Sequence, residues 1–183
     1  YAVTMQVEGD LTVEKIEFLN ISNFAKINSI TRKNLELTKN QREKTVYGSL
    51  LWVMDKCRTS MGTRLLKRFI NSPLLDVDEI SERQENVQYF IDNVLVREDM
   101  KEKMENIYDL ERLIGKIIFG NENGKDLISL KNTVKSSIEL MHILKGTDFF
   151  RGIEPQILLD VYRHIEESIR DDAPFSVREG GMI

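Results

Sequence analysis

The sequence predicts an all-α fold, a multi-helix core of packed long helices with short strand or extended pieces at its two ends. Apolar residues recur at helical spacing in several long stretches, and turn signals with helix-capping residues separate these stretches. The composition agrees, because 183 residues with 41% hydrophobic and 31% charged residues are typical of a globular protein that buries a sizeable core.

The N-terminal part of the chain has a different pattern from the rest. Residues 3–7 alternate between apolar and polar, which indicates a short strand or an extended linker. The pattern becomes helical at Ile27, and Thr31 is a candidate cap for a short helix. We therefore expect a boundary between residues 1–26 and residues 27–183.

Residues 49–74 form two helical runs that are separated at residues 58–60. The first run is apolar over most of its circumference, because Trp52 and Met54 widen its stripe, so we expect it to be buried nearly all round. Cys57 lies on the same stripe. We expect this cysteine in the core rather than as a nucleophile.

The second run has clear signals at both ends. Thr59 or Ser60 supplies a hydroxyl that can accept from the free amides of the first turn, and Pro73 stops the run. Gly62, near the start, removes a side chain where we expect two helix ends to approach closely.

Four further helices are expected after Pro73, with limits set by caps and breakers. Asp76 or Asp78, Asp126 and Pro155 begin helices, and Gly146 ends one. The expected spans are residues 78–93, 97–119, 126–146 and 155–170, with a loop at 120–124 and a candidate strand at 175–181.

Charge and cysteine content narrow the function classes. The net charge of −4 argues against a segment that grips nucleic acid unaided, since that requires clustered Lys and Arg. The single cysteine offers no disulfide framework and favours a reducing, cytoplasmic compartment. No apolar run approaches the length of a membrane span, so we expect no membrane partner.

We find no group of residues that predicts catalysis, a cofactor site or a metal site within this chain. His142 and His164 fall on separate predicted helices without ligands at metal-binding spacing, and we expect both to be exposed. Asp109 and Glu111 are two residues apart, on different helix faces. The basic run at residues 32–44 is interrupted by acids, so a solvated face is expected, with a weak phosphate contact as the alternative.

Two charged residues occupy positions where the helical period requires apolar ones. Glu111 and Arg83 each fall within the apolar arc of their predicted helix. A lone buried charge is costly, so we predict that Glu111 is partly buried and ion-paired to Arg83 or Arg64. The alternative is that both side chains reach the helix edge. The structural or allosteric candidates are therefore Arg64, Arg83, Asp109, Glu111 and Arg112.

Several motifs follow one another in a characteristic order. They include Thr31-Arg-Lys-Asn-Leu-Glu-Leu37, Thr59-x-Met-Gly-x-Arg-Leu-Leu66, Asp109-Leu-Glu-Arg-Leu113 and Arg178-Glu-Gly-Gly181. Together they resemble the core-domain signature of the MutS family of DNA mismatch-recognition ATPases. The departures are mild: Asn28 stands where Asp is usual, and Lys116 and Lys125 stand where Arg is usual.

The resemblance implies a role within a larger protein. Residues 1–26 would end a connector domain, and residues 27–183 would be the core or lower lever, cut just before a DNA-clamp insertion. The segment would couple the ATPase domain to the clamp and mismatch-binding domains. ATP and Mg²⁺ are the implied cofactors of the whole protein, a DNA-dependent ATPase. Its implied partners are mismatched duplex DNA and a second MutS subunit.

The family's two active motifs, a Phe-x-Glu mismatch wedge and a GxxxxGK[ST] phosphate loop, do not occur in this sequence. We therefore expect the segment alone to bind neither ATP nor mismatched duplex with preference. Two alternatives remain open. One is a MutS paralogue acting in recombination or junction binding. The other is a self-standing helical interaction or helix-turn-helix module with residues 59–71 as its recognition helix, although that helix leaves little polar face to enter a groove.

Overall fold

The computed structural model describes residues 23–171, and this part of the chain contains eight helices and no sheet. Phe24 and Leu74 form an isolated antiparallel bridge, which is the one extended pairing in the described range. The all-α prediction is confirmed, whereas the alternating residues 3–7 and the candidate strand at 175–181 lie outside the described residues. The helices are α1 (Ser29–Asn34), α2 (Leu50–Met54), α3 (Ser60–Asn71), α4 (Val77–Asp92), α5 (Val94–Met104), α6 (Leu110–Ile118), α7 (Gly124–Ile143) and α8 (Pro155–Ser168).

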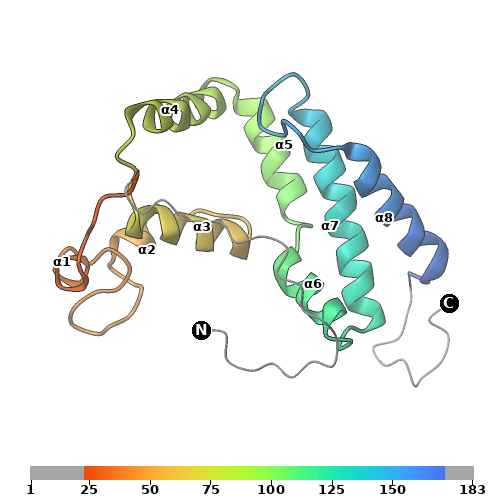
Figure 1. The fold of residues 1–183 in the computed structure, drawn as a ribbon, viewed down its shortest axis with the longest axis horizontal. Coiled ribbons are helices and arrows are strands. Elements are labelled where there is room, and N and C mark those ends of the chain that lie inside the picture. Colours follow the sequence, from red (N-terminus) through yellow and green to blue (C-terminus); the bar gives the residue numbers. More distant parts are fainter. Residues whose placement is uncertain (1–22, 172–183) are drawn as a thin grey trace.

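The C-terminal half is organised around α7, the longest described helix. In Figure 1, α5 and α8 lie along the two sides of α7, and α6 packs near its N-terminal end. Because α7 touches three neighbours, it buries apolar and polar residues on several faces. The resulting cluster, called here the C-terminal core, contains the buried residues Leu113, Leu130, Val134 and Ile165.

The N-terminal half contains a second and smaller cluster. Leu37, Leu51 and Ile70 are buried together, from the loop after α1, from α2 and from α3, and we call them the N-terminal core. Backbone bonds align these pieces, because the amide of Leu51 donates to the carbonyl of Leu37 at 2.9 Å. A core of three buried side chains gives little stability by itself, so contacts to the rest of the chain matter.

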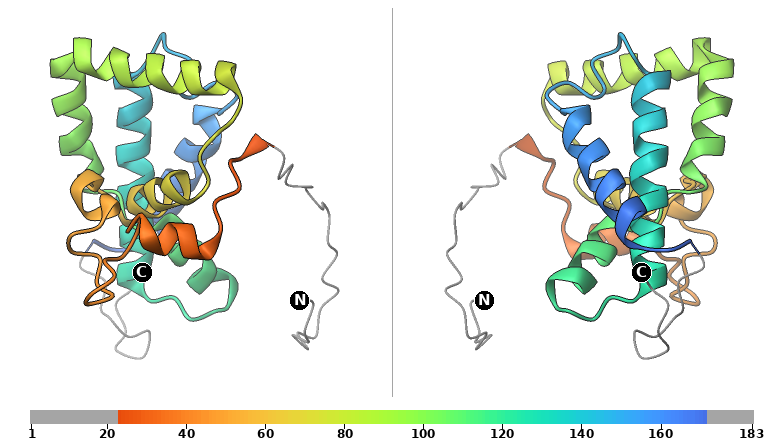
Figure 2. Two further views of the ribbon diagram at one scale, coloured as in Figure 1. Left: turned by 90° about the vertical axis from the view of Figure 1, so that its left-hand side faces the viewer. Right: turned by 90° about the vertical axis from the view of Figure 1, so that its right-hand side faces the viewer.

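Helix α4 leads from the N-terminal half to α5 in Figure 1, and the side views in Figure 2 show it across the end of the molecule opposite α6. Near its first turns, the guanidinium of Arg83 lies 3.7 Å from the ring centroid of Phe69 on α3. At its other end, Tyr89 and Phe90 stack against Phe149 in the loop before α8, with ring centroids 5.8 and 5.1 Å away. These cation–π and aromatic contacts fix α4 to both halves.

Some predicted boundaries are confirmed and others are wrong. Thr59 caps α3 by accepting from the amide of Gly62 at 3.0 Å, and α8 begins at Pro155. Asp126 does not begin α7. Asn123 caps the helix by accepting from the amide of Asp126, and the Asp126 side chain accepts in return from the amide of Asn123. The two residues form a capping box. Similarly, α1 is capped by Asn28, whose side chain accepts from the amide of Thr31.

The single helix predicted over residues 97–119 is two helices. Helix α5 ends at Met104, and α6 begins at Leu110 after a five-residue break. Within the segment Asp109 caps α6, and two contacts from outside stabilise the break: Arg64 of α3 binds Asp109, and the hydroxyl of Thr133 on α7 accepts from the amide of Tyr108. Apolar periodicity within the segment continues across the break and could not predict these partners, although Asn106 and Asp109 are weak helix formers and Asp109 is a preferred N-cap residue.

The prediction that the first run of residues 49–74 is buried all round is also wrong. Helix α2 has only five residues, and Leu51 alone among them is buried. Trp52 remains 47% exposed and lies against the ring of Tyr47, and Cys57 is exposed after the helix ends. The reason is that a short helix presents only one face to the small N-terminal core.

Gly62 lies in a crowded place, but its neighbours belong to the connection between α2 and α3 and not to the end of α2 as predicted. A Cβ atom added there would meet Thr59 Oγ1 at 3.2 Å and Cys57 Cβ at 3.3 Å. Gly115, within α6, has open space instead, with nothing within 4 Å of an added Cβ. Substituting alanine at Gly115 therefore tests helix propensity alone, whereas alanine at Gly62 tests helix propensity and steric crowding together.

We predict that Gly115→Ala stabilises the chain by about 0.5–1 kcal/mol, because alanine costs less backbone entropy than glycine in a helix. Gly62→Ala should gain less than this or be destabilising, because the same propensity gain is offset by crowding against Thr59 and Cys57. Urea unfolding midpoints of the two variants provide the measurement. Equal stabilisation by both variants would show that Gly62 is not needed for packing.

Candidate functional site

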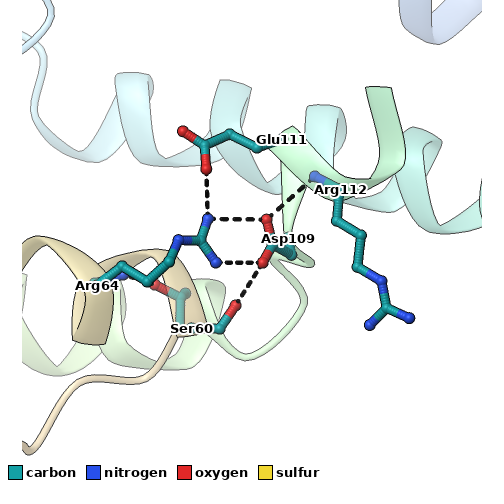
Figure 3. A network of polar contacts seen from close by, with 7 residues as sticks. Ser60, Arg64, Asp109, Glu111 and Arg112 are labelled. Carbon is teal, nitrogen blue, oxygen red and sulfur yellow. Dashed lines mark hydrogen bonds and ion pairs between the residues drawn. The ribbon is translucent and has the colours of Figure 1, made fainter. Parts of the chain in front are cut away.

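The candidate site is a group of polar side chains where α3 meets the beginning of α6 (Figure 3). Arg64 on α3 forms a bidentate pair with Asp109, with Nη1 2.5 Å from Oδ2 and Nη2 3.1 Å from Oδ1. The same Nη2 also lies 2.6 Å from Glu111 Oε2. One guanidinium thus holds two carboxylates that are separated from it by more than forty residues of sequence.

Asp109 has additional partners, which makes it the centre of this group. The hydroxyl of Ser60, at the start of α3, donates to Asp109 Oδ2 at 3.2 Å. The amide of Arg112 donates to Oδ1 at 3.3 Å, which is the N-cap bond of α6. A single carboxylate therefore begins one helix and binds the first turn of another. We call Ser60, Arg64, Asp109 and Glu111 the α3–α6 junction.

A buried threonine on α7 holds the backbone beside Asp109. Thr133 is only 1% exposed, and its hydroxyl accepts from the amide of Tyr108 at 3.0 Å. The same hydroxyl donates to the carbonyl of Ser129 at 2.8 Å, so both of its hydrogen-bonding functions are used. Since Tyr108 directly precedes Asp109, this contact positions the cap residue relative to the C-terminal core.

The junction is electrostatically strong but open to solvent. The Asp109 side chain is 21% exposed, that of Arg64 47%, and that of Glu111 81%. The hydrogen bonds from Arg64, and also those from the Arg112 amide and Ser60, lower the pKa of Asp109 from 3.8 to about 2. In turn, Asp109 and Glu111 raise the pKa of Arg64. Both groups are therefore charged near neutral pH, which suits an ion pair and not proton transfer.

A family model described as MutS domain III matches residues 30–183. This chain belongs to the MutS domain III family. It is similar over its whole length to the DNA mismatch repair protein MutS of Fusobacterium nucleatum, with 45% identity over 186 residues. The proteins of the same name from Clostridium botulinum (Langeland) and Bacillus subtilis are 38% and 37% identical over 93% of the chain.

The MutS domain III chain spans about a fifth of the length of these relatives, namely 21%, 19% and 20%. Two of the motifs that resemble the family also meet in space. Arg64 belongs to the motif at residues 59–66, and Asp109 and Glu111 belong to the motif at residues 109–113. Their order in the sequence does not reveal this contact.

The structure places the five predicted structural or allosteric residues differently. The predicted pairing of Glu111 with Arg64 is present, but its predicted burial is wrong. Helix α6 packs through Leu110, Leu113 and Ile117, so Glu111 in its first turn lies on the exposed side of the helix. Arg83 does not pair with Glu111, since it stacks on Phe69. Arg112 contributes its backbone amide, while its guanidinium points away from Asp109 in Figure 3.

Sequence reasoning missed Ser60 and Thr133 as partners, and it also missed a second ion-pair site at Lys131. The Lys131 side chain is 7% exposed, with Nζ 2.6 Å from Glu166 Oε2 and also bonded to Asp171. The hydrogen bonds from Lys131 to Asp171 and Glu166 raise the pKa of Lys131. These ion pairs join α7 to α8 and to the residues just after it. The sequence contains a signal for this site. Lys131 follows Leu127 by four residues, so it falls on the apolar arc of the predicted helix, where a charged residue needs a partner.

The described residues of the MutS domain III chain hold no group of three His, Cys, Asp or Glu side chains that could bind a metal ion. His142 and His164 are both exposed, as predicted. Within residues 23–171, no helix is long and apolar enough to cross a membrane.

We predict that Thr133→Val destabilises the MutS domain III chain by about 1–3 kcal/mol, because the amide of Tyr108 loses its acceptor while the volume of the side chain is kept. Ser137→Ala is the matched control. The Ser137 hydroxyl only donates back to the Thr133 carbonyl within α7, so its loss should change stability by less than about 0.5 kcal/mol. Urea unfolding is the measurement, and equal effects of the two variants would contradict the positioning role of Thr133.

We also predict a pH-dependent difference between the wild-type chain and Asp109→Asn. The folded-state pKa is lowered from 3.8 to about 2, so the carboxylate stabilises the fold above about pH 4 and loses this effect as the pH falls toward 2. The difference in urea midpoint should be constant from pH 7 to 5 and shrink steadily between pH 4 and 2. A difference that does not depend on pH would show that the Asp109 charge is not involved.

Proposed function

We propose that this chain is the core and lower-lever segment of a MutS-type DNA mismatch-recognition ATPase. In this proposal, residues 1–26 end the connector domain and residues 27–183 are the core. The observation that carries it is the MutS domain III match over residues 30–183, supported by relatives that are each named as DNA mismatch repair protein MutS. The segment couples the ATPase domain to the clamp and mismatch-binding domains and contributes no catalytic group.

Coupling of this kind needs packed bodies that can move against each other as units, because packed cores switch between arrangements rather than deform continuously. Two features support the assignment. Residues 23–171 form two separate cores, and specific contacts link the two halves of this range. One link is the α3–α6 junction, and another is the contact of α4 with Phe69 and Phe149.

The α3–α6 junction is suited to relay a displacement. Since Asp109 caps α6 and also binds Arg64, a movement of α3 that pulls on the carboxylate disturbs the first turn of α6. Because the pair is partly exposed, water can replace each partner, so the junction can open without leaving a buried charge. A relay with these properties can take two states within a small energy range.

The other parts of the proposal concern the whole protein. ATP and Mg²⁺ would bind in an ATPase domain, and mismatched duplex DNA would be held by the clamp and mismatch-binding domains. A second MutS subunit would complete the assembly, and its location would be cytoplasmic. The paralogue alternative is less favoured, because the relatives named above are mismatch repair proteins. The helix-turn-helix alternative gains no support from α2, which is only five residues long.

We predict that Asp109→Asn in the full-length protein that contains this segment weakens the coupling between ATP and mismatched DNA. The affinity for a mismatched duplex is measured with and without ATP, and the ratio of the two dissociation constants reports the coupling. Since allosteric coupling is commonly 5–150-fold, we expect the variant's ratio to move toward 1 by about threefold or more. The affinity for ATP alone should be unchanged.

Lys101→Gln is the control, because it removes a surface pair with Glu98 on α5 that is not in the junction. It should leave the ratio at the wild-type value. A wild-type ratio in Asp109→Asn, with normal ATP and DNA binding, would show that the junction does not carry the signal.

A further inference from the structure

We propose that a hollow lined by Lys26, Arg32 and Arg68 docks an acidic segment of the same polypeptide that lies outside residues 23–171. The inference rests on the proposed function only in taking this chain as part of a longer protein. We call this feature the basic hollow. It has a volume of about 470 Å³ and is separate from the α3–α6 junction.

The basic hollow is built by three segments that the backbone holds in register. The amide of Ala25 donates to the Pro73 carbonyl at 2.8 Å, and the amide of Leu75 donates to the Asn23 carbonyl at 3.0 Å. These bonds place the extended residues 24–27 beside the end of α3. Arg32, in the last turn of α1, completes the wall. The three cations therefore converge because the fold brings together residues from three parts of the sequence.

The charges of the basic hollow are not balanced by the residues around it. Its lining contains no acidic residue. In the described range, none of Lys26, Arg32 and Arg68 forms an ion pair, whereas Arg64, Lys116 and Lys131 all do. This concentration of positive charge occurs in a chain whose net charge is −4. An anionic partner is the occupant that such a site favours.

The floor of the basic hollow decides which anion fits. Phe24, Ala25 and Ile27 contribute apolar surface between the cations. A nucleic-acid backbone offers phosphates but no side chain to fill an apolar floor, and the net charge of the chain opposes DNA. A protein segment with an apolar residue flanked by Asp or Glu satisfies both features, since its anchor covers the floor and its carboxylates meet the rim.

The size of the basic hollow indicates that the partner is tethered. Seven residues line it, whereas a stable interface between free proteins uses about 20–30 residues a side. Exposed ion pairs each contribute little because water screens them, so this site alone would hold a free partner weakly. A segment of the same polypeptide avoids this limit, because a linker provides effective concentrations on the order of millimolar. The relatives are about five times longer than this chain and have ample length for such a segment.

The test is zero-length crosslinking of the full-length protein with a water-soluble carbodiimide. The reagent joins a lysine amine to a carboxylate in contact with it as an amide, and the carbodiimide takes up the water that is lost and becomes a urea. Mass spectrometry identifies the peptides. We expect an amide between Lys26 and an Asp or Glu outside residues 23–171, in protein that migrates as a monomer on a denaturing gel. The Lys103–Glu139 pair, at 3.2 Å, is the internal positive control.

A double variant, Arg32→Gln with Arg68→Gln, should lower the yield of the Lys26 crosslink at least threefold. The matched control is Lys33→Gln with Lys67→Gln, two neighbouring exposed cations that do not line the hollow, and it should leave the yield unchanged. The Lys103–Glu139 crosslink in each variant shows that the fold is retained.

Absence of a Lys26 crosslink while Lys103–Glu139 forms would overturn the proposal, as would a product that migrates as a dimer. Protection of Lys26 from acetylation by added duplex DNA, without any carboxylate crosslink, would assign the site to nucleic acid instead. These results are independent of the coupling ratio of Asp109→Asn, so failure of the docking site and failure of the coupling function can be distinguished.

Discussion

The arrangement of this chain depends on the carboxylate of Asp109. It binds the guanidinium of Arg64 through two parallel hydrogen bonds and simultaneously begins α6. A bidentate pair fixes direction as well as distance, so α3 is held in one orientation relative to α6. The hydroxyl of Thr133 on α7 accepts from the amide of Tyr108 and fixes the backbone beside the cap. Asp109 thereby connects α3 to α6, and the neighbouring Tyr108 connects the same segment to α7.

The need for such a connection follows from the size of the cores. The N-terminal core has three buried side chains, and the C-terminal core has four, so neither half buries much apolar surface. Large apolar side chains also remain exposed on the helices between them, including Leu95 at 82% and Val77 at 73%. In such a molecule, specific polar and aromatic contacts decide how the halves are oriented, while the hydrophobic effect mainly stabilises each half.

Membership in the MutS domain III family gives this architecture a functional context. Two family motifs that are distant in sequence supply the two sides of the α3–α6 junction, which links the family resemblance to a physical contact. A coupling segment does not require reactive groups. The coupling role proposed above would require units that move as rigid bodies and contacts that can open at low cost, and the partial exposure of Arg64 and Asp109 is consistent with the second requirement.

The sequence by itself determined the helical class, most helix limits and the family, because apolar periodicity, caps and prolines act over a few residues. Thr59 and Pro155 were interpreted correctly for this reason. Only the tertiary structure decided where Asp109, Glu111 and Arg83 go. The break before α6 is stabilised by α3 and α7, and α6 packs through Leu110, Leu113 and Ile117 and not through the side that carries Glu111. The guanidinium of Arg83 stacks on the ring of Phe69 and does not pair with a carboxylate in the described part of the chain. Long-range partners of this kind leave no periodic signal in the segment they act on.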